Sequence, residues 1–433
     1  MRIQTLGLVA LFATASMAAH AVDIQSWQLK NGAKVLFIES HQNPIVDVSV
    51  SFNAGGMQDD PAKLGVAGFT GGLMDAGAGD LDEEAFNERT ADLAVSISSA
   101  AGTESAGVGF RSLSKKDVLN PTVALTNLVL TKPRFDAAIL KREQDRAVLS
   151  LKQGETSPGF LSARAYATLN YGDHPYGYGA KTTEASIRAI SRDDLVRFHQ
   201  AYYAQDNAIV SIVGDLSKAQ ANTLAERLLQ GLPAKASELR TLPKVDTDKK
   251  GQRRNIAHPS SQASIVMGYP VITRDDPDYY AFMVGNYILG GGGFESRLMK
   301  ELRDNRGLTY GVSSSFSPSL EKGTFSIGLK TKKATTEEAL ALSQKVLTDY
   351  LKQGPSATEV KQAQDNMIGG FPLRIDTNAK LLSYLSLIGQ YNLPLTYLDD
   401  YPKAVAKVTP EQIKEVWQRR INPAFLNIVV VGG

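Results

Sequence analysis

The sequence predicts an α+β protein built from two tandem homologous domains, each a mainly antiparallel sheet packed with helices. An internal repeat is the first observation. Residues 190–214 align without a gap with residues 408–432, and both read as an amphipathic helix, a polar turn and a β-branched strand ending in Gly. The second observation is an upstream match, in which the strand–turn–strand pattern of residues 97–116 returns from Val312 onward. Strands and helices also come in runs, which favours α+β over a doubly wound parallel sheet.

The remaining elements follow in chain order. Strands at residues 34–39 and 46–52 open the first half, and a strand ASIVMGYPV opens the second. A helix is expected over Phe294–Asp304 in the second half. Helices of the first half are expected near residues 65–76, 83–93, 117–130, 134–153 and 160–169.

The chain divides into four expected segments: a signal peptide at 1–21, a first domain at 22–231, a linker at 232–261 and a second domain at 262–433. The first 21 residues hold one Arg, an apolar run too short to span a membrane, and a small-x-small cleavage site. The linker is rich in Lys, Arg, Pro and Ser and lacks apolar periodicity. We therefore expect an exported, periplasmic protein.

Composition narrows the classes of function. The chain has no cysteine, so an exported protein of this size would be held together by its hydrophobic core alone. Its 47 basic and 45 acidic residues nearly cancel, to a net charge of +2, and no motif that reads nucleic acid occurs. No stretch after the signal peptide is apolar for long enough to predict a membrane span.

The expected helix at 65–76 carries an unusual stripe of glycines. Val66 and Leu73 belong to a buried helical face, whereas Gly68, Gly71 and Gly72 recur at i, i+3 and i+4 and leave a second face without side chains. Each interior glycine costs a helix about 1 kcal/mol relative to alanine. Either another element packs very close to this face, or a set of side chains has been lost from it.

Four features together carry a family resemblance. Three of the features are sequence segments. They are G-V-A-x-F-x-x-x-L-M at 65–74, the block at 174–217 that runs from HPYGYG to VGDLS, and LGGGGFESRLMKELRDNRGLTYGVSSSFSP at 289–318. The fourth feature is the duplication itself. With these in this order, the sequence resembles a half-length member of the insulinase/pitrilysin family of zinc peptidases over nearly all of its length after the signal peptide. The resemblance implies the two-domain α+β fold of that family.

In active members of this family the metal helix carries the motif H-x-x-E-H, whose two His bind Zn²⁺ and whose Glu acts as general base. The resemblance places Gly68, Gly71 and Gly72 at those three positions. A third ligand, a Glu, belongs in a long helix further on, but the corresponding segment 147–152 has no carboxylate. Glu143 and Glu155 lie on either side of that segment, but neither falls at the position of the third ligand. We therefore expect no metal site and no cofactor in this chain, whose other histidines after the signal peptide are isolated at His41, His174, His199 and His258.

The second half keeps residues that the resemblance assigns to substrate. Similar peptidases use an Arg and a Tyr seven residues apart to orient the peptide and polarise its carbonyl, and Arg303 and Tyr310 have that spacing. Arg306 is the rival for the arginine role. The run Gly290, Gly291, Gly292 and Gly293 resembles the glycine-rich loop of the catalytically silent α subunit of mitochondrial processing peptidase, where the loop is implicated in substrate contact. Its alternative interpretation is a flexible turn before a helix.

The strand that begins at residue 97 departs from the family. Active members usually have N-A-x-T there, at a strand edge that pairs with the substrate backbone, whereas this sequence has Ser98–Ala101 in that place. Pairing of substrate with this strand is therefore not expected.

Two hypotheses of function remain. In the first, the chain is a non-catalytic subunit of a periplasmic two-chain zinc peptidase, whose partner is a paralogue with H-x-x-E-H that holds the zinc. Arg303 and Tyr310 would then act on a peptide in trans. In the second, the chain is a non-enzymatic scaffold or peptide-binding protein of the same fold. Retention of the Arg303/Tyr310 pair favours the first, because a scaffold has no need of it.

Overall fold

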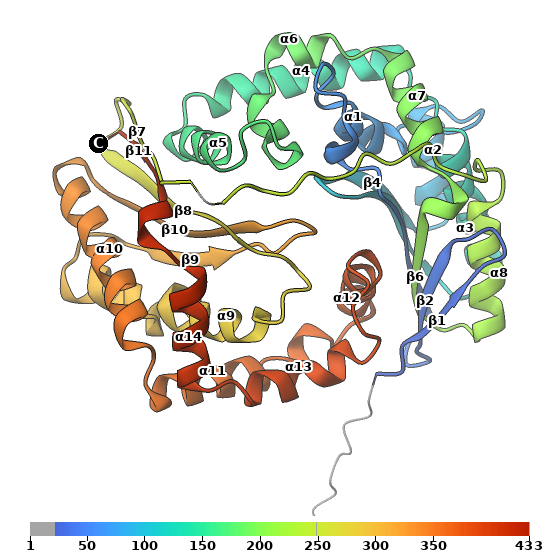
Figure 1. Ribbon diagram of the computed structural model, residues 1–433. Helices are drawn as coiled ribbons and strands as arrows, with labels where there is room; N and C mark the ends of the chain where they lie inside the picture. The colour runs from blue at the N-terminus through green and yellow to red at the C-terminus, as the bar shows by residue number, and fades with distance from the viewer. Residues whose placement is uncertain (1–21, 248, 433) are drawn as a thin grey trace, which may run out of the picture.

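The computed structural model describes residues 22–247 and 249–432. The signal peptide expected at 1–21 therefore lies outside the described residues. Two sheets organise the rest, and each has its own helices packed on one face (Figure 1). Within the described ranges, no helix is both long enough and apolar enough to cross a membrane.

The first sheet has six strands in the order β1-β2-β6-β3-β5-β4. All of its strand pairs are antiparallel except β2 with β6, which run parallel. The strands are β1 (Gln25–Gln28), β2 (Lys34–Glu39), β3 (Ile45–Phe52), β4 (Ser96–Ala101), β5 (Ala106–Leu113) and β6 (Ala208–Gly214). The helices of this half are α1 (Val66–Leu73), α2 (Glu83–Asp92), α3 (Lys116–Thr131), α4 (Ala137–Gly154), α5 (Pro158–Tyr171), α6 (Glu184–Arg188), α7 (Arg192–Tyr202) and α8 (Lys218–Leu229).

The second sheet has five strands in the order β7-β11-β8-β10-β9. Its strands are β7 (Arg253–Ile256), β8 (Gln262–Ile272), β9 (Val312–Phe316), β10 (Gly323–Lys332) and β11 (Asn427–Val431). Its α-helices are α9 (Tyr279–Asn286), α10 (Thr336–Gln353), α11 (Ala357–Gly369), α12 (Asn378–Gln390), α13 (Tyr397–Ala406) and α14 (Pro410–Arg420). Two π-helical segments, η4 (Tyr287–Gly291) and η6 (Met299–Asn305), flank the glycine-rich loop. Short 3₁₀ turns are η1 (Gly56–Gln58), η2 (Pro175–Lys181), η3 (Gln205–Asn207), η5 (Gly293–Glu295), η7 (Lys333–Thr335), η8 (Pro372–Arg374) and η9 (Pro423–Phe425).

The α+β fold class predicted from the repeat is confirmed. Both copies of the repeat fold as a capped helix followed by a strand, α7–β6 in the first half and α14–β11 in the second. Ser191 and Thr409 each close a capping box at the start of the helix, which satisfies amide groups that would otherwise lack a partner. Gly214 and Gly432 follow at the strand ends with φ of 151° and 86°, backbone angles that favour glycine.

Two expectations about individual elements are wrong in part. Residues 253–256, within the expected linker at 232–261, form strand β7, which pairs in parallel with β11. Three of the four β7 side chains are exposed, so the strand is held by backbone hydrogen bonds and leaves little hydrophobic signal. The helix expected over Phe294–Asp304 starts late: a 3₁₀ turn ends at Glu295, and helical structure begins at Arg297 and continues as the π-helix η6 from Met299.

Each half contributes one helix to the sheet of the other half. Helix α5, from the first half, packs on β8 and β11, while α12, from the second half, packs on β6, β3 and β2 (Figure 1). The α12 contact is close, since a Cβ added at Gly389 would lie 2.7 Å from the Ile209 Cγ2 atom. The two halves therefore form one interlocked body, with the sheet faces that α5 and α12 partly cover turned toward the other half.

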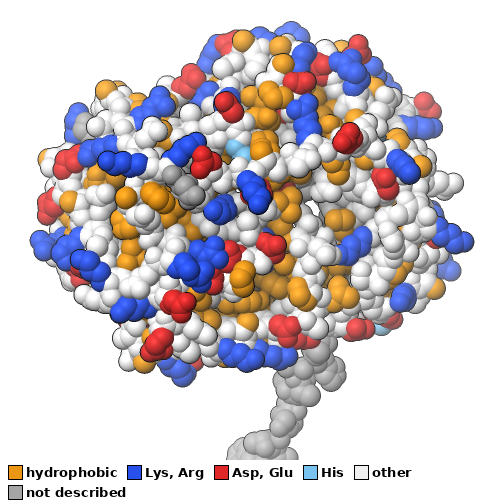
Figure 2. All heavy atoms as spheres, in the orientation of Figure 1, with side chains coloured by type: hydrophobic (Ala, Val, Ile, Leu, Met, Phe, Trp, Pro, Cys, Tyr) orange, Lys and Arg blue, Asp and Glu red, His pale blue; other side chains and the backbone are white. Residues whose placement is uncertain are grey.

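Charge is distributed evenly over the surface in view. On the face shown in Figure 2, basic and acidic side chains are interspersed and do not gather by sign. This agrees with the near-zero net charge of the sequence and offers no basic stripe for nucleic acid on that face.

Candidate functional site

Helix α1, the counterpart of the metal helix, begins without a cap of its own. Its N-cap residue is Gly65, at φ 99°, which has no side chain to accept a hydrogen bond. The carboxylate of Asp59 takes that role from outside the helix, because it accepts the amide hydrogens of Gly65 and Ala67, each at 2.7 Å. Burial raises the pKa of Asp59 to about 6, despite those two hydrogen bonds.

The glycine stripe of α1 has two different explanations along its length. A Cβ added at Gly71 would lie 2.7 Å from the Ala101 Cβ and 2.8 Å from the Ala101 backbone nitrogen. At Gly68 and Gly72, no atom lies within 4 Å of the added Cβ. Close packing against β4 therefore accounts for Gly71, while Gly68 and Gly72 face open space where the resemblance would place the two His ligands.

A second contact holds α1 against β4. The carboxylate of Asp75, just beyond the C-terminal end of α1, accepts the backbone N–H of Ser99 at 3.1 Å. Burial raises the pKa of Asp75. Strand β4 is one of the two edge strands of the first sheet, so this contact and the Gly71 packing stabilise a strand that is paired on one side only.

No other part of the described chain supplies the missing ligands. Segment 147–152 lies in α4 and has no carboxylate, as the sequence indicates. Glu143 pairs with Arg142 and Arg146, each at 2.8 Å, so that flanking carboxylate is already engaged. Across residues 22–247 and 249–432, no group of three or more His, Cys, Asp and Glu side chains could hold a metal ion. The expectation that the chain carries no zinc remains a prediction for metal analysis.

The four histidines expected to be isolated lie apart and bond to different groups. His199 is buried, with its Nε2 2.8 Å from the Leu130 carbonyl oxygen. His41 lies between two carboxylates, those of Glu39 and Asp215, which raise its pKa. His174 and His258 bond to the carbonyl oxygens of Pro243 and Thr156, respectively. No two of these histidines bond to a common group.

Arg303 and Tyr310 present their side chains outward. The Arg303 guanidinium lies 4.6 Å from the centre of the Phe294 ring, and its ion pair with Asp304 is long at 3.8 Å. Tyr310 is 88% exposed, and in the described part of the chain its hydroxyl bonds to no other group. Arg303 belongs to the π-helix η6, a rare conformation that is frequent at functional sites. No described hydrogen bond or ring contact joins Arg303 to Tyr310.

The structure separates Arg306 from Arg303. Arg306 lines a hollow of about 410 Å³ together with Lys345 and Asp349 of α10, and Arg303 is not among its lining residues. Arg303 instead stacks on Phe294, the residue that follows the glycine run. Of the two arginines, Arg303 is therefore the one beside the glycine-rich loop.

The four loop glycines lie in two environments. Gly290 is buried against β9, where an added Cβ would lie 2.4 Å from the Ser314 backbone nitrogen. Gly292 packs against its own preceding turn, where an added Cβ would lie 2.8 Å from the Tyr287 carbonyl oxygen. Gly291 and Gly293 are exposed, so they are the two that a ligand could reach first. Substrate contact by this loop remains a prediction.

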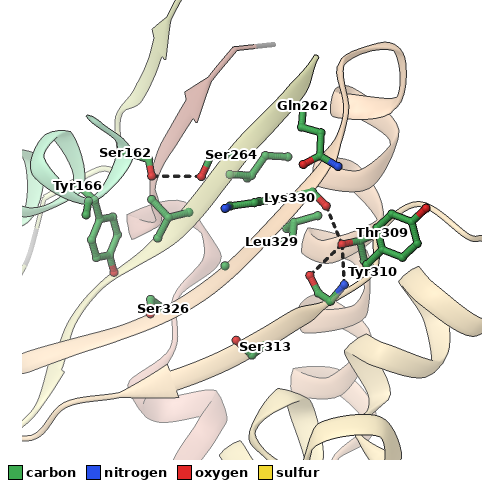
Figure 3. A pocket seen from close by; sticks show the side chains of 15 residues that line it. Ser162, Tyr166, Gln262, Ser264, Thr309, Tyr310, Ser313, Ser326, Leu329 and Lys330 are labelled. Atoms are coloured by element: carbon green, nitrogen blue, oxygen red, sulfur yellow. Dashed lines mark hydrogen bonds between the residues drawn. The ribbon is translucent and has the colours of Figure 1, made fainter. Parts of the chain in front are cut away.

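Tyr310 also stands at the rim of a hollow of about 610 Å³ on the second sheet, which we name the β8–β10 hollow (Figure 3). The hollow has no signal in the sequence, because its lining residues come from α5, three strands and a loop that are far apart in the chain. They are Ser162, Ala163, Tyr166, Gln262, Ser264, Ile265, Val266, Thr309, Tyr310, Gly311, Ser313, Ser326, Gly328, Leu329 and Lys330.

Glu104 is a buried carboxylate that joins the two halves, and nothing in the local sequence indicates this role. It accepts hydrogen bonds from the Tyr391 hydroxyl at 2.6 Å, the Leu320 amide at 2.9 Å and the Gln390 side chain at 3.2 Å, all in the second half. The Tyr176 hydroxyl of the first half donates to it as well. Glu104 lies in the turn between β4 and β5, and Leu320 in the turn between β9 and β10. The tips of the two equivalent hairpins therefore meet here.

Comparison with known proteins gives the family. A family model described as insulinase, peptidase family M16, matches residues 34–177, and one described as the peptidase M16 inactive domain matches residues 189–367. The non-peptidase homolog YmxG of Helicobacter pylori is 26% identical over 392 residues, which span 89% of each chain.

Solved structures agree with those matches. A peptidase M16 inactive domain from Pseudomonas fluorescens has a TM-score of 0.91 and 35% identity, over 95% of this chain and 98% of that one. The periplasmic protease PqqL of Escherichia coli shares the fold with a TM-score of 0.80 at 16% identity, and 99% of this chain spans 48% of it. The chain carries Gly68, Gly71 and Gly72 on the helix that corresponds to the metal helix, and it belongs to the insulinase family, peptidase family M16.

Proposed function

We propose that this chain is the non-catalytic subunit of a periplasmic two-chain zinc peptidase. It supplies Arg303, Tyr310 and a peptide-binding surface in trans to a paralogous subunit that carries H-x-x-E-H. The zinc of that partner would activate the attacking water, as zinc does in metalloproteases generally. In this proposal the chain holds no zinc itself.

The contrast between the two halves carries the proposal. The metal helix has lost all three motif side chains, and Gly71 is packed so tightly that a base has no room to return. Arg303 and Tyr310 are retained, and the Tyr310 ring projects into solvent rather than packing into its own chain. A guanidinium and a phenol are donors suited to the negative charge that develops on a peptide carbonyl oxygen. Arg303 and Tyr310 are donors that face outward in a chain without the zinc-binding motif. They therefore fit an active site whose zinc is supplied by a second chain.

The relation to longer members of the fold supports the same arrangement. The E. coli protease PqqL is about twice as long as this chain and is named a periplasmic protease. A single chain of that length can hold two units of this size, so two separate chains could supply the same two units. The short apolar run and cleavage site at residues 1–21 support export of this chain to the same compartment.

The test is reconstitution with an exported paralogue that carries H-x-x-E-H, preferably one encoded beside this chain. We expect the two chains to copurify and to cleave a quenched fluorescent peptide library that neither chain cleaves alone. Glu→Gln in the motif of the paralogue is the control, and it should abolish cleavage without affecting copurification. A paralogue that is fully active without this chain would contradict the proposal and leave the scaffold hypothesis.

A further inference from the structure

The floor of the β8–β10 hollow is the face of the second sheet that turns toward the first half. Ser264 of β8 and Gly328 and Lys330 of β10 belong to that face, because residues two apart in a strand point to the same side. Helix α5 forms one wall, and Tyr310 stands at the rim (Figure 3). The hollow therefore adjoins the residue that we assign to substrate, on a surface with room for a ligand.

Most hydroxyl groups around the β8–β10 hollow already have partners in the chain. The Ser162 and Ser264 hydroxyls bond to each other at 3.2 Å. Tyr166 donates to a backbone carbonyl of β10 at 2.9 Å, and Thr309 donates to the Lys330 carbonyl oxygen at 2.6 Å. These bonds fix the walls and leave few donors free for a ligand.

Lys330 is the charged group of the hollow. Its side chain lies along the sheet, with the amino group over the floor and directed toward α5 (Figure 3). Within the described ranges, its ammonium has no ion pair or hydrogen-bond partner, and the lining contains no carboxylate. The Gln262 side-chain amide adds a further donor at the edge of the hollow. A lone ammonium among neutral donors is complementary to a carboxylate.

The neighbouring sheet edge is occupied at one residue, Ser314. Strand β9 is the edge strand, but the Asn286 side-chain amide donates to the Ser314 carbonyl oxygen at 3.4 Å. Gly290 packs against the Ser314 amide on the same side. A peptide that extended the sheet at Ser314 would have to displace these contacts, whereas the hollow offers side chains for recognition without such a change.

We propose that the β8–β10 hollow binds an acidic side chain, Asp or Glu, of an extended peptide through the Lys330 ammonium. This inference rests on the proposed function, because it assigns the class of peptide that the two-chain peptidase binds. Lys332 provides a matched comparison: it lies on the same face of β10, two residues further on, but does not line the hollow.

A charge-swap binding experiment on the full chain without its signal peptide tests the assignment. The probes are short fluorescein-labelled Gly/Ser/Ala peptides, amidated at the C-terminus, with one central Glu, Gln or Lys, and the readout is fluorescence anisotropy. We expect the Glu peptide to bind about fivefold more tightly than the Gln peptide, the upper range for a solvent-accessible ion pair. Lys330→Glu should reverse the preference in favour of the Lys peptide, and Lys332→Glu should leave it unchanged.

Three outcomes would overturn the assignment: no difference between the Glu and Gln peptides, an equal effect of Lys332→Glu, or binding only of peptides with a free C-terminal carboxylate. Each of these is read on the isolated chain. Reconstitution with the H-x-x-E-H paralogue tests the proposed function separately, so the failure of one proposal is distinguishable from the failure of the other.

Discussion

Gly71→Ala adds one methyl group to α1 at the point where the helix meets β4. In an ordinary helix interior, replacing glycine with alanine stabilises by about 1 kcal/mol. At Gly71 the new Cβ would lie 2.7 Å from the Ala101 Cβ and 2.8 Å from the Ala101 nitrogen, well inside the 3.4 Å at which ordinary contact begins. Because backbone is involved, no flexible side-chain end can move aside to make room.

The expected magnitude follows from these two opposing effects. Overpacking a well-packed site costs about 1–3 kcal/mol, which offsets or exceeds the helix-propensity gain at Gly71. Gly68→Ala and Gly72→Ala place the same methyl group in open space and should keep the gain. We therefore expect Gly71→Ala to be less stable than Gly68→Ala by about 1–3 kcal/mol.

Urea unfolding of the three single variants measures this difference directly, with the free energy of unfolding extrapolated to water. Gly68→Ala and Gly72→Ala serve as controls on the same helix. If Gly71→Ala proved as stable as Gly68→Ala, the close approach of α1 to β4 would be refuted. The glycine stripe would then reflect lost ligands alone.

Three further predictions concern zinc, pH and the contact between the halves. The purified chain should bind no stoichiometric zinc, and the triple variant Gly68→His, Gly71→Glu, Gly72→His should not gain activity, because Gly71 has no space and segment 147–152 has no carboxylate. One tightly held zinc per wild-type chain, measured by elemental analysis, would contradict this. Burial raises the pKa of Asp59 from 3.8 to about 6, so the folded state binds this proton more tightly than the unfolded state does. The stability of the wild type relative to Asp59→Asn should therefore increase as the pH falls from about 6 to about 4, and a difference independent of pH in denaturant titrations would rule this out. Glu104→Ala should lower the free energy of unfolding by about 1–3 kcal/mol, because it leaves partly buried donors such as the Tyr391 hydroxyl and the Leu320 amide without their acceptor. Unchanged stability would show that the contact between the hairpin tips is dispensable.

The fold was largely predictable because its strongest signal is long-range and repeated. Two copies of one helix–strand unit predicted the α+β class and the duplicated arrangement. The N-cap residues Ser191 and Thr409 were predictable from the local sequence. Strand β7 was not predictable, because exposed side chains in a short edge strand carry no periodicity. The exchange of α5 and α12 between the two sheets depends on tertiary packing, which local patterns do not encode.

The candidate site, like the fold, was only partly predictable from the sequence. Loss of the metal ligands was readable from Gly68, Gly71 and Gly72, because the motif has fixed spacing on one helix. The tight packing at Gly71 was not, since it depends on where β4 lies. Glu104 has no local signature either: a single Glu in a turn is usually exposed, and its four donors come from three distant segments.

The turnover number of the reconstituted two-chain peptidase decides whether this chain takes part in catalysis. Arg303→Ala and Tyr310→Phe should each lower kcat by about 10²–10³, the loss typical of removing one donor to a developing oxyanion, while assembly and the zinc of the partner stay intact. Arg306→Ala is the control and should retain activity, since Arg306 lines a different hollow. Full kcat in the Arg303 and Tyr310 variants, with the complex assembled, would contradict a role in trans and favour a scaffold.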